Sequence, residues 1–269
     1  MNKVKKGLVS ASVLLFSTVL LVGGAFGISS ALAHSAVAEE GKIISNNTLI
    51  STSGIGKETD TNMPKTPRYT IVDSEITAGA TAKDISKEKA VSSAADKIMQ
   101  MFGDNLDGSR ANPHFSKSSS KVIQKDMWVV DFHPTDESKT YWCNVDSVTG
   151  EVYYITLFDK SKELTFGVEP EDMTPQQKQT LREADDKLSA QRDATRNDNR
   201  FIEVARDIVS AHLLNGRTVV SSKFNAFSGV NSSLWLQVAV SMSDGSGYLI
   251  NLDAFTRELV GFETRPDGV

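Results

Sequence analysis

The sharpest catalytic candidate in this sequence is a thiol with an imidazole, Cys143 with His133. A thiolate activated by a nearby imidazole is the attacking group of many hydrolases. The strand-like pattern of 139–146, however, puts Cys143 on the same face as Tyr141 and Val145, because alternate residues of a strand share a face. A small hydrophobe in such company is typical of a core, so we expect a structural, buried Cys143.

Other patterns of catalysis or metal binding are missing from the sequence. The single cysteine excludes an intrachain disulfide and a zinc site built from several cysteines. No HExxH, G-x-S-x-G or glycine-rich phosphate loop occurs. Asp185 and Asp186 are adjacent, but with Lys187 beside them they indicate a solvated, charged surface. We therefore expect a protein that is not an enzyme and has no catalytic residue, cofactor or metal. The four histidines are His34, His114, His133 and His212.

The charge of the chain argues against nucleic acid as a partner. The net charge is −5 and the sequence pI is about 5.5. Proteins that bind nucleic acid usually show a basic footprint, and none is visible in this sequence. Removal of residues 1–33 would take away three lysines and leave a net charge of −8, which also disfavours binding to anionic surfaces.

Residues 1–33 have the composition of an export segment. Three lysines among the first six residues precede an apolar stretch at 8–22, and the small-x-small triplet Ala31-Leu32-Ala33 follows. Together these features indicate a secretory signal peptide. Residues 8–28 are also long enough to span a bilayer as a retained anchor. Both alternatives stay open, and both make the protein extracytoplasmic, either secreted or held by one N-terminal transmembrane helix.

The rest of the chain divides into four parts. Residues 34–83 are rich in Ser, Thr, Gly and Asn and indicate a flexible stalk, with one possible strand at 68–73. Residues 84–160 and 200–269 each begin with a helical pattern and continue as strands. Residues 161–199 indicate a polar helical connector that begins at Thr174-Pro175. The predicted strands are 122–132, 139–146, 151–158, 219–224, 234–242, 247–252 and 258–263.

The two strand-bearing parts repeat each other in register. The first predicted helix lies between Ser86 and Gly103, and the second ends at Gly216. The helical faces match at a step of 111 residues and the strands at a step of 107, so the second copy has a shorter connection. The matched pairs include Trp128 with Trp235, Tyr141 with Tyr248, Asp146 with Asp253, Thr149 with Thr256, and Glu151 with Glu258.

The repeat assigns structural roles to several residues. Asp146 and Asp253 each precede a tight turn, where a carboxylate can accept hydrogen bonds from backbone amides two residues on. Gly150 tolerates a positive φ in the first turn, whereas Arg257 does not do so freely, so we expect two different turn types. Cys143 takes the place of an isoleucine in the other copy. Its neighbour Trp142 points to the opposite face, which predicts either packing between modules or an exposed binding patch.

The stretch from Trp128 to Val152 resembles the PepSY domain family. The resemblance is carried by Trp128-Val129-Val130-Asp131-Phe132 and by the ending Val145-Asp146, Thr149-Gly150 and Glu151-Val152. Tyr248 to Leu259 is similar to a degraded copy of this ending. The resemblance implies an α+β fold of two tandem modules, each a helix packed on a small antiparallel sheet, joined by the polar helical connector. The PepSY family has no defined catalytic residues, so the resemblance assigns none to this chain.

The export segment, the repeat and the resemblance together predict a non-catalytic exported protein that binds or regulates a partner. The resemblance implies that the partner is an extracellular peptidase or another cell-envelope enzyme. Contact with a membrane is expected only through residues 8–28, if they are retained. Two alternatives stay open, which are a structural or assembly spacer at the membrane and a hydrolase with an unrecognised site.

Overall fold

The computed structural model describes residues 69–72, 79–117, 125–135, 137–164, 166–229 and 233–269, all of which belong to one compact unit. The first elements are β1 (Thr70–Ile71), α1 (Lys87–Phe102), β2 (Arg110–Ser116), β3 (Met127–His133), β4 (Lys139–Asp146), β5 (Val152–Asp159) and a 3₁₀ turn, η1 (Lys160–Lys162). The remaining elements are α2 (Pro175–Thr195), α3 (Asn199–His212), β6 (Val219–Ser228), β7 (Trp235–Met242), β8 (Gly247–Asp253) and β9 (Leu259–Arg265).

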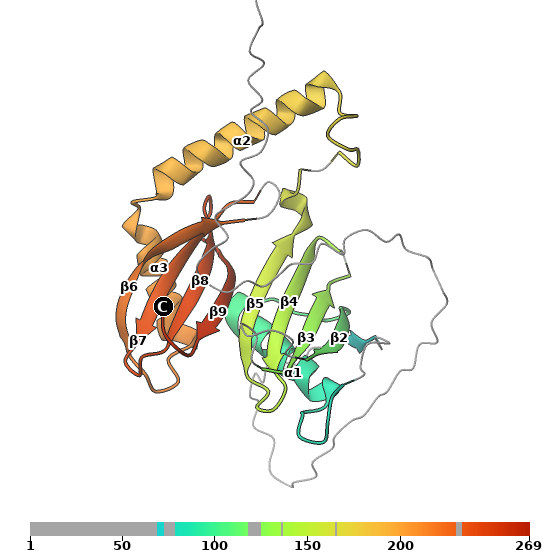
Figure 1. Ribbon diagram of the computed structural model, residues 1–269, viewed down its shortest axis with the longest axis vertical. Helices are drawn as coiled ribbons and strands as arrows, with labels where there is room; N and C mark the ends of the chain where they lie inside the picture. Colours follow the sequence, from blue (N-terminus) through green and yellow to red (C-terminus); the bar gives the residue numbers. More distant parts are fainter. Residues whose placement is uncertain (1–68, 73–78, 118–124, 136, 165, 230–232) are drawn as a thin grey trace, which may run out of the picture. The chain divides into compact units, whose positions relative to one another are not determined.

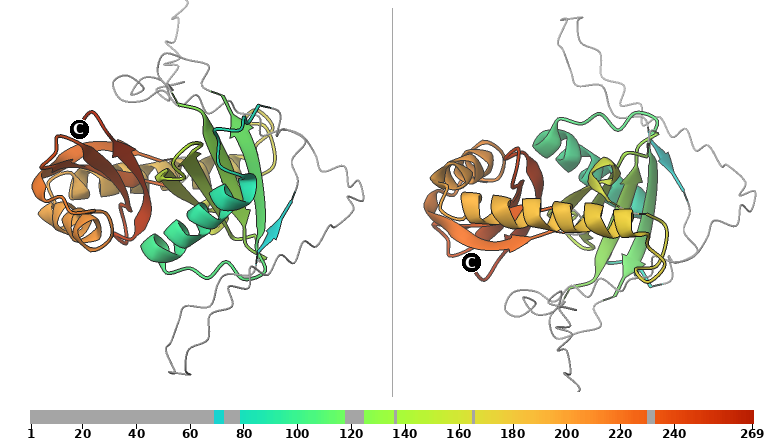
Figure 2. Two further views of the ribbon diagram at one scale, coloured as in Figure 1. Left: turned by 90° about the horizontal axis from the view of Figure 1, so that it is seen from below. Right: turned by 90° about the horizontal axis from the view of Figure 1, so that it is seen from above.

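All nine described strands form one sheet, in the order β1-β2-β3-β4-β5-β9-β8-β7-β6 (Figure 1). Neighbouring strands are antiparallel, except that β1 runs parallel to β2. Helices α1 and α3 pack on the same face of this sheet, and α2 lies across the ends of the strands (Figure 2). The face away from α1 and α3 is called the outer face below.

The prediction of two tandem modules, each with its own small sheet, is wrong. Strand β5 of the first half pairs with β9 of the second. The backbone N–H and C=O groups along these two strand edges therefore hydrogen-bond to each other. One hydrophobic core contains the buried faces of both α1 and α3. The α+β class is compatible with the structure, and the two halves keep the same order of a helix followed by four strands.

The helices begin and end largely where the sequence indicates. The Ser86 side chain accepts a hydrogen bond from the Lys89 amide, and Gly103 ends α1 with a φ of 69°. Thr174 forms a capping box at the start of α2. The half-buried stripe of α2 consists of Leu181, Ala184 and Leu188. Helix α3 ends at His212, four residues before the predicted Gly216.

Strand β2 was not predicted from the sequence, where this segment belonged to a polar loop. Its residues alternate between buried and less buried positions, with Ala111, Pro113 and Phe115 facing the core. Pro113 lacks a backbone N–H and is unusual within a sheet, which is why a sequence pattern argues against a strand here. The next strand, β3, begins at Met127, and the first residues of the predicted strand, 122–124, lie outside the described residues. The predicted strand at 68–73 is confirmed as the two-residue β1.

The junction between the halves depends on a close approach of two backbones at Gly261. Only three residue pairs join β5 to β9, and one of them is Thr156 with Gly261. A Cβ atom placed on Gly261 would lie 2.3 Å from the Ile155 carbonyl oxygen. Because this oxygen belongs to the backbone, it cannot move without shifting β5, so glycine is required at this position.

The predicted export segment lies outside the described residues, as does most of the predicted stalk. No helix among the described residues is both long and apolar enough to cross a membrane.

Gly261→Ala is expected to lower the free energy of unfolding by about 2 kcal/mol, because the added methyl group forces the paired strands apart. Thr264→Ala, on the same strand beyond the three pairs, is the matched control and should have a smaller effect. Denaturant unfolding followed by circular dichroism measures both. An unchanged unfolding midpoint for Gly261→Ala would show that β5 and β9 do not approach as described.

Candidate binding surface

Cys143 and His133 do not form a catalytic pair in this structure. The Cys143 side chain is 0% exposed and faces the helices, within the core. Val130 pairs with Cys143 and faces the core with it. His133 is three residues further along β3, and because successive strand residues face opposite sides of a sheet, it lies on the outer face. Burial, followed by the nearby charge of Asp131, raises the pKa of the Cys143 thiol well above its usual value. Both effects disfavour the thiolate that a nucleophile needs.

The remaining candidate residues are also dispersed. Burial lowers the pKa of both His114 and His133, which come from neighbouring strands, whereas His212 lies at the end of α3. Asp185 and Asp186 are exposed on α2, as expected of a solvated surface. Within the described part of the chain, no three His, Cys, Asp or Glu side chains are grouped so that they could hold a metal ion. His34 lies outside the described residues.

The predicted turn roles of the repeated aspartates are confirmed. Asp146 accepts hydrogen bonds from the amides of Val148 and Thr149 at 3.0 and 2.8 Å. Asp253 accepts the equivalent pair from the amides of residues 255 and 256 at 2.8 and 3.0 Å. The prediction of two different turn types is wrong, because Arg257 has a φ of 66° and Gly150 one of 75°. The shared hydrogen bonds impose the left-handed conformation in spite of the arginine side chain.

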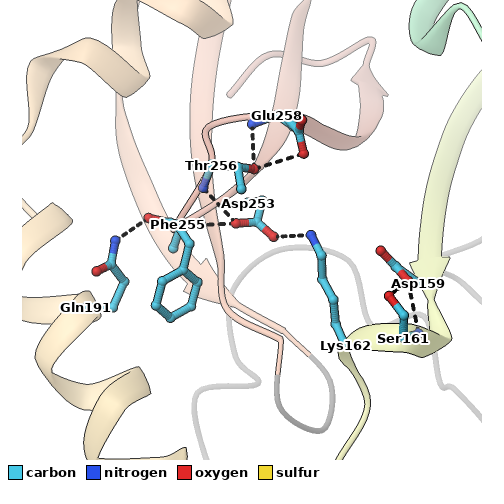
Figure 3. A network of polar contacts seen from close by, with 9 residues as sticks. Asp159, Ser161, Lys162, Gln191, Asp253, Phe255, Thr256 and Glu258 are labelled. Carbon is cyan, nitrogen blue, oxygen red and sulfur yellow. Dashed lines mark hydrogen bonds and ion pairs between the residues drawn. The ribbon is translucent and has the colours of Figure 1, made fainter.

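The turn at Asp253 also joins several elements, as Figure 3 shows. Lys162, just after β5, forms an ion pair with Asp253 at 2.8 Å, and Gln191 of α2 donates a hydrogen bond to the Ala254 carbonyl. Burial raises the pKa of Asp253, but the hydrogen bonds from Lys162 and the turn amides outweigh it and hold the pKa below its usual value. This network fixes the end of the sheet where α2 passes.

Two aromatic rings from the two halves of the chain meet on the outer face. Phe158 of β5 and Trp235 of β7 both point to this face, and their ring centroids are 6.3 Å apart. Strands β9 and β8 lie between them in the sheet order, and flat strands that far apart would be separated by roughly 14 Å. The two rings therefore approach each other across β9 and β8 on this face.

A row of paired positions crosses the outer face. The paired positions run from Asp131 through Trp142, Thr156 and Gly261 to Asn251. Gln237 continues the row and donates a hydrogen bond to the Asn251 side chain at 3.0 Å. The row therefore extends from β3 to β7 and carries hydrogen-bonding groups from both halves of the chain.

Trp142 is the large exposed side chain of this row. It is 38% exposed, whereas Leu249, its counterpart in the second half, is only 8% exposed. The Trp142 indole N–H donates to the Asn144 side chain at 3.1 Å, which holds the ring over the outer face. Of the two predictions for this residue, the structure therefore favours an exposed patch over packing between modules. An exposed aromatic ring with a fixed orientation is typical of binding surfaces.

Asp131 lies directly opposite Trp142 in the pairing of β3 with β4. Its Oδ1 atom is buried and has no hydrogen-bond partner among the described residues. Burial raises the pKa of this carboxyl to about 6. A buried carboxylate oxygen without a hydrogen-bond partner destabilises the fold, so its presence marks a candidate functional position.

Asp131 and Trp142 together can recognise a cationic side chain. The face of the indole attracts a guanidinium or ammonium group, and the neighbouring carboxylate adds an opposite charge. Sequence reasoning missed the contribution of Asp131, although this residue stands within the stretch that resembles PepSY domains. A lone acid among the apolar residues Val130 and Phe132 was the available signal.

Comparisons with known proteins give distant matches only. No protein-family model and no curated protein matches the chain. The solved structure of the Bacillus megaterium YpeB C-terminal domain matches 68% of this chain at 8% identity and a TM-score of 0.36. This chain spans 64% of that domain. A Clostridium leptum protein of unknown function matches 69% of this chain and 91% of its own length, at 12% identity and a TM-score of 0.29. The resemblance to PepSY domains therefore remains a prediction.

The thiol of Cys143 is expected to resist a disulfide reagent such as dithionitrobenzoate in the folded protein and to react at once in guanidinium, because the folded chain buries it. A Val148→Cys change in a Cys143→Ala background is the positive control, since Val148 is 62% exposed. Rapid labelling of Cys143 without denaturant would contradict the buried assignment.

Asp131→Asn is expected to stabilise the protein at pH 8 by about 2 kcal/mol, because it removes a buried charge. The carboxyl has a folded-state pKa above its unfolded value, so its cost is fully present above pH 6 and disappears as the pH falls from about 6 to below 4. Urea unfolding at several pH values should show the gain shrinking over this window. Asp185→Asn, on exposed α2, is the control, and a gain independent of pH would contradict the assignment.

Proposed function

We propose that this chain is an exported, non-catalytic protein that binds a partner protein at the cell envelope through the outer face of its sheet. The observation that carries the proposal is the fixed and exposed Trp142 ring opposite Asp131, whose buried Oδ1 atom has no hydrogen-bond partner among the described residues. Tryptophan is enriched among the residues that contribute most to binding at protein interfaces.

The chemistry of this surface favours a partner with a basic side chain. A lysine or arginine of the partner would stack on the indole of Trp142 and compensate the charge of Asp131. The negative net charge of the chain assists the approach of such a partner over longer distances. The export part of the proposal rests on residues 1–33, and the choice of a peptidase or another envelope enzyme rests on the resemblance to PepSY domains.

Capture of the partner from an envelope fraction with the immobilised chain tests this proposal. Trp142→Ala is expected to weaken binding by about 2 kcal/mol, or roughly thirtyfold, because interface tryptophans contribute strongly to affinity. Val220→Ala is the matched control, since Val220 is exposed on edge strand β6, away from this row. Higher salt should also weaken binding to the wild-type chain.

Three results distinguish the proposal from its alternatives. A stoichiometric partner whose peptidase activity changes on binding, and whose capture requires Trp142, supports it. Capture that is unaffected by Trp142→Ala would contradict the use of the outer face. A partner that binds without any change in its activity would favour the structural spacer instead.

A further inference from the structure

A cleft opens on the helix side of the sheet, at the junction of the two halves. Its volume is about 300 Å³, which is at the lower end for sites that bind small ligands. Helix α1, the start of β5, the end of α3 and strands β8 and β9 all contribute to it. The lining includes Ser93, Asp96, Lys97, Gln100, Glu151, Leu213, Asn215, Tyr248, Phe262 and Thr264.

Lys97 is the only lysine or arginine that lines this cleft, and its charge is incompletely compensated. The half-buried ammonium donates a hydrogen bond to Gln100 Oε1 at 2.9 Å and lies 5.9 Å from the centre of the Phe262 ring. Among the described residues, no carboxylate forms an ion pair with it. An ammonium has three N–H donors, so two remain available to a bound molecule.

Burial lowers the pKa of Lys97, and the charge of Glu151 only partly opposes this effect. The cleft therefore holds a half-buried cation whose charge Glu151 compensates only in part. An anion bound beside Lys97 would remove this penalty.

The walls around Lys97 are held in place from both halves of the chain. Gln100, which accepts the hydrogen bond from Lys97, also donates one through Nε2 to the His212 carbonyl at the end of α3, at 3.3 Å. The Tyr248 hydroxyl donates to the Leu213 carbonyl at 3.0 Å and accepts a hydrogen bond from Arg217. A preorganised site of this kind loses little conformational entropy when a ligand binds.

We infer that this cleft binds a monoanionic carboxylate, of the size of a peptide C-terminus, and that Lys97 pairs with the carboxylate. Ser93, Asn215 and Thr264 offer additional hydrogen bonds to the body of the ligand. Asp96 and Glu151 also line the cleft, and their charges oppose every anion, a doubly charged phosphate about twice as strongly as a monoanionic carboxylate. Because the lining comes from both halves, the bound ligand stabilises their junction.

The test uses the full chain and two matched probes, N-acetyl-alanyl-alanine and its C-terminal amide. Calorimetric titration should show binding of the acid, with the amide weaker by roughly tenfold or more, because only the acid supplies a charged acceptor. Lys97→Met keeps the length of the side chain without its charge and should abolish binding of the acid. Lys89→Met, an exposed lysine on the same helix, is the control and should leave binding unchanged.

A second measurement does not depend on whether the Lys97→Met variant folds. In the wild-type chain, the pKa of Lys97, followed by NMR of its ε-carbon, should rise when the acid probe binds. Equal affinity for acid and amide, binding retained by Lys97→Met, or binding of inorganic phosphate in place of the carboxylate would each overturn the inference. Trp142→Ala should leave the carboxylate affinity unchanged, so this site and the proposed protein interface can fail independently.

Discussion

The pairing of β5 with β9 is the constraint on which the rest of this structure depends. Three residue pairs connect two halves that each offer a helix and four strands, and they turn two small sheets into one. The approach is close because Gly261 has no side chain to hold the Ile155 backbone away. An isolated hairpin edge would expose unpaired backbone groups, whereas the junction satisfies them and merges the two apolar faces into one core.

The two candidate sites lie on opposite faces of the sheet. On the outer face, Asp131 and Trp142 both belong to the first half, and their row reaches the junction at Thr156 and Gly261. On the helix side, the ends of α1 and α3 meet around Lys97. The cleft at Lys97 therefore lies where the two halves join, which is a common location of binding sites because two surfaces meet there.

Local features of this structure were predictable, whereas the long-range pairing was not. Helical periodicity and caps located α1 at Ser86 and Gly103, and strand alternation placed Cys143 in the core. No pattern in a sequence says which strand edges will pair, so two modules were expected in place of one sheet. Asp131 looked like an ordinary outward-facing residue, because its burial results from the surrounding sheet. A lone glycine within a strand, Gly261, was the one available signal of close backbone approach.

Amide hydrogen exchange along β5 and β9 tests the continuous sheet most directly. If the halves share one sheet, residues 154–156 and 261–263 lie in its interior, and the amides that are hydrogen-bonded across the junction should exchange as slowly as those of the central strands β4 and β8. If the halves are separate modules, both segments are free edges and should exchange as rapidly as the outward-facing amides of edge strand β6. Rapid exchange at both segments would contradict the account, and slow exchange would support it.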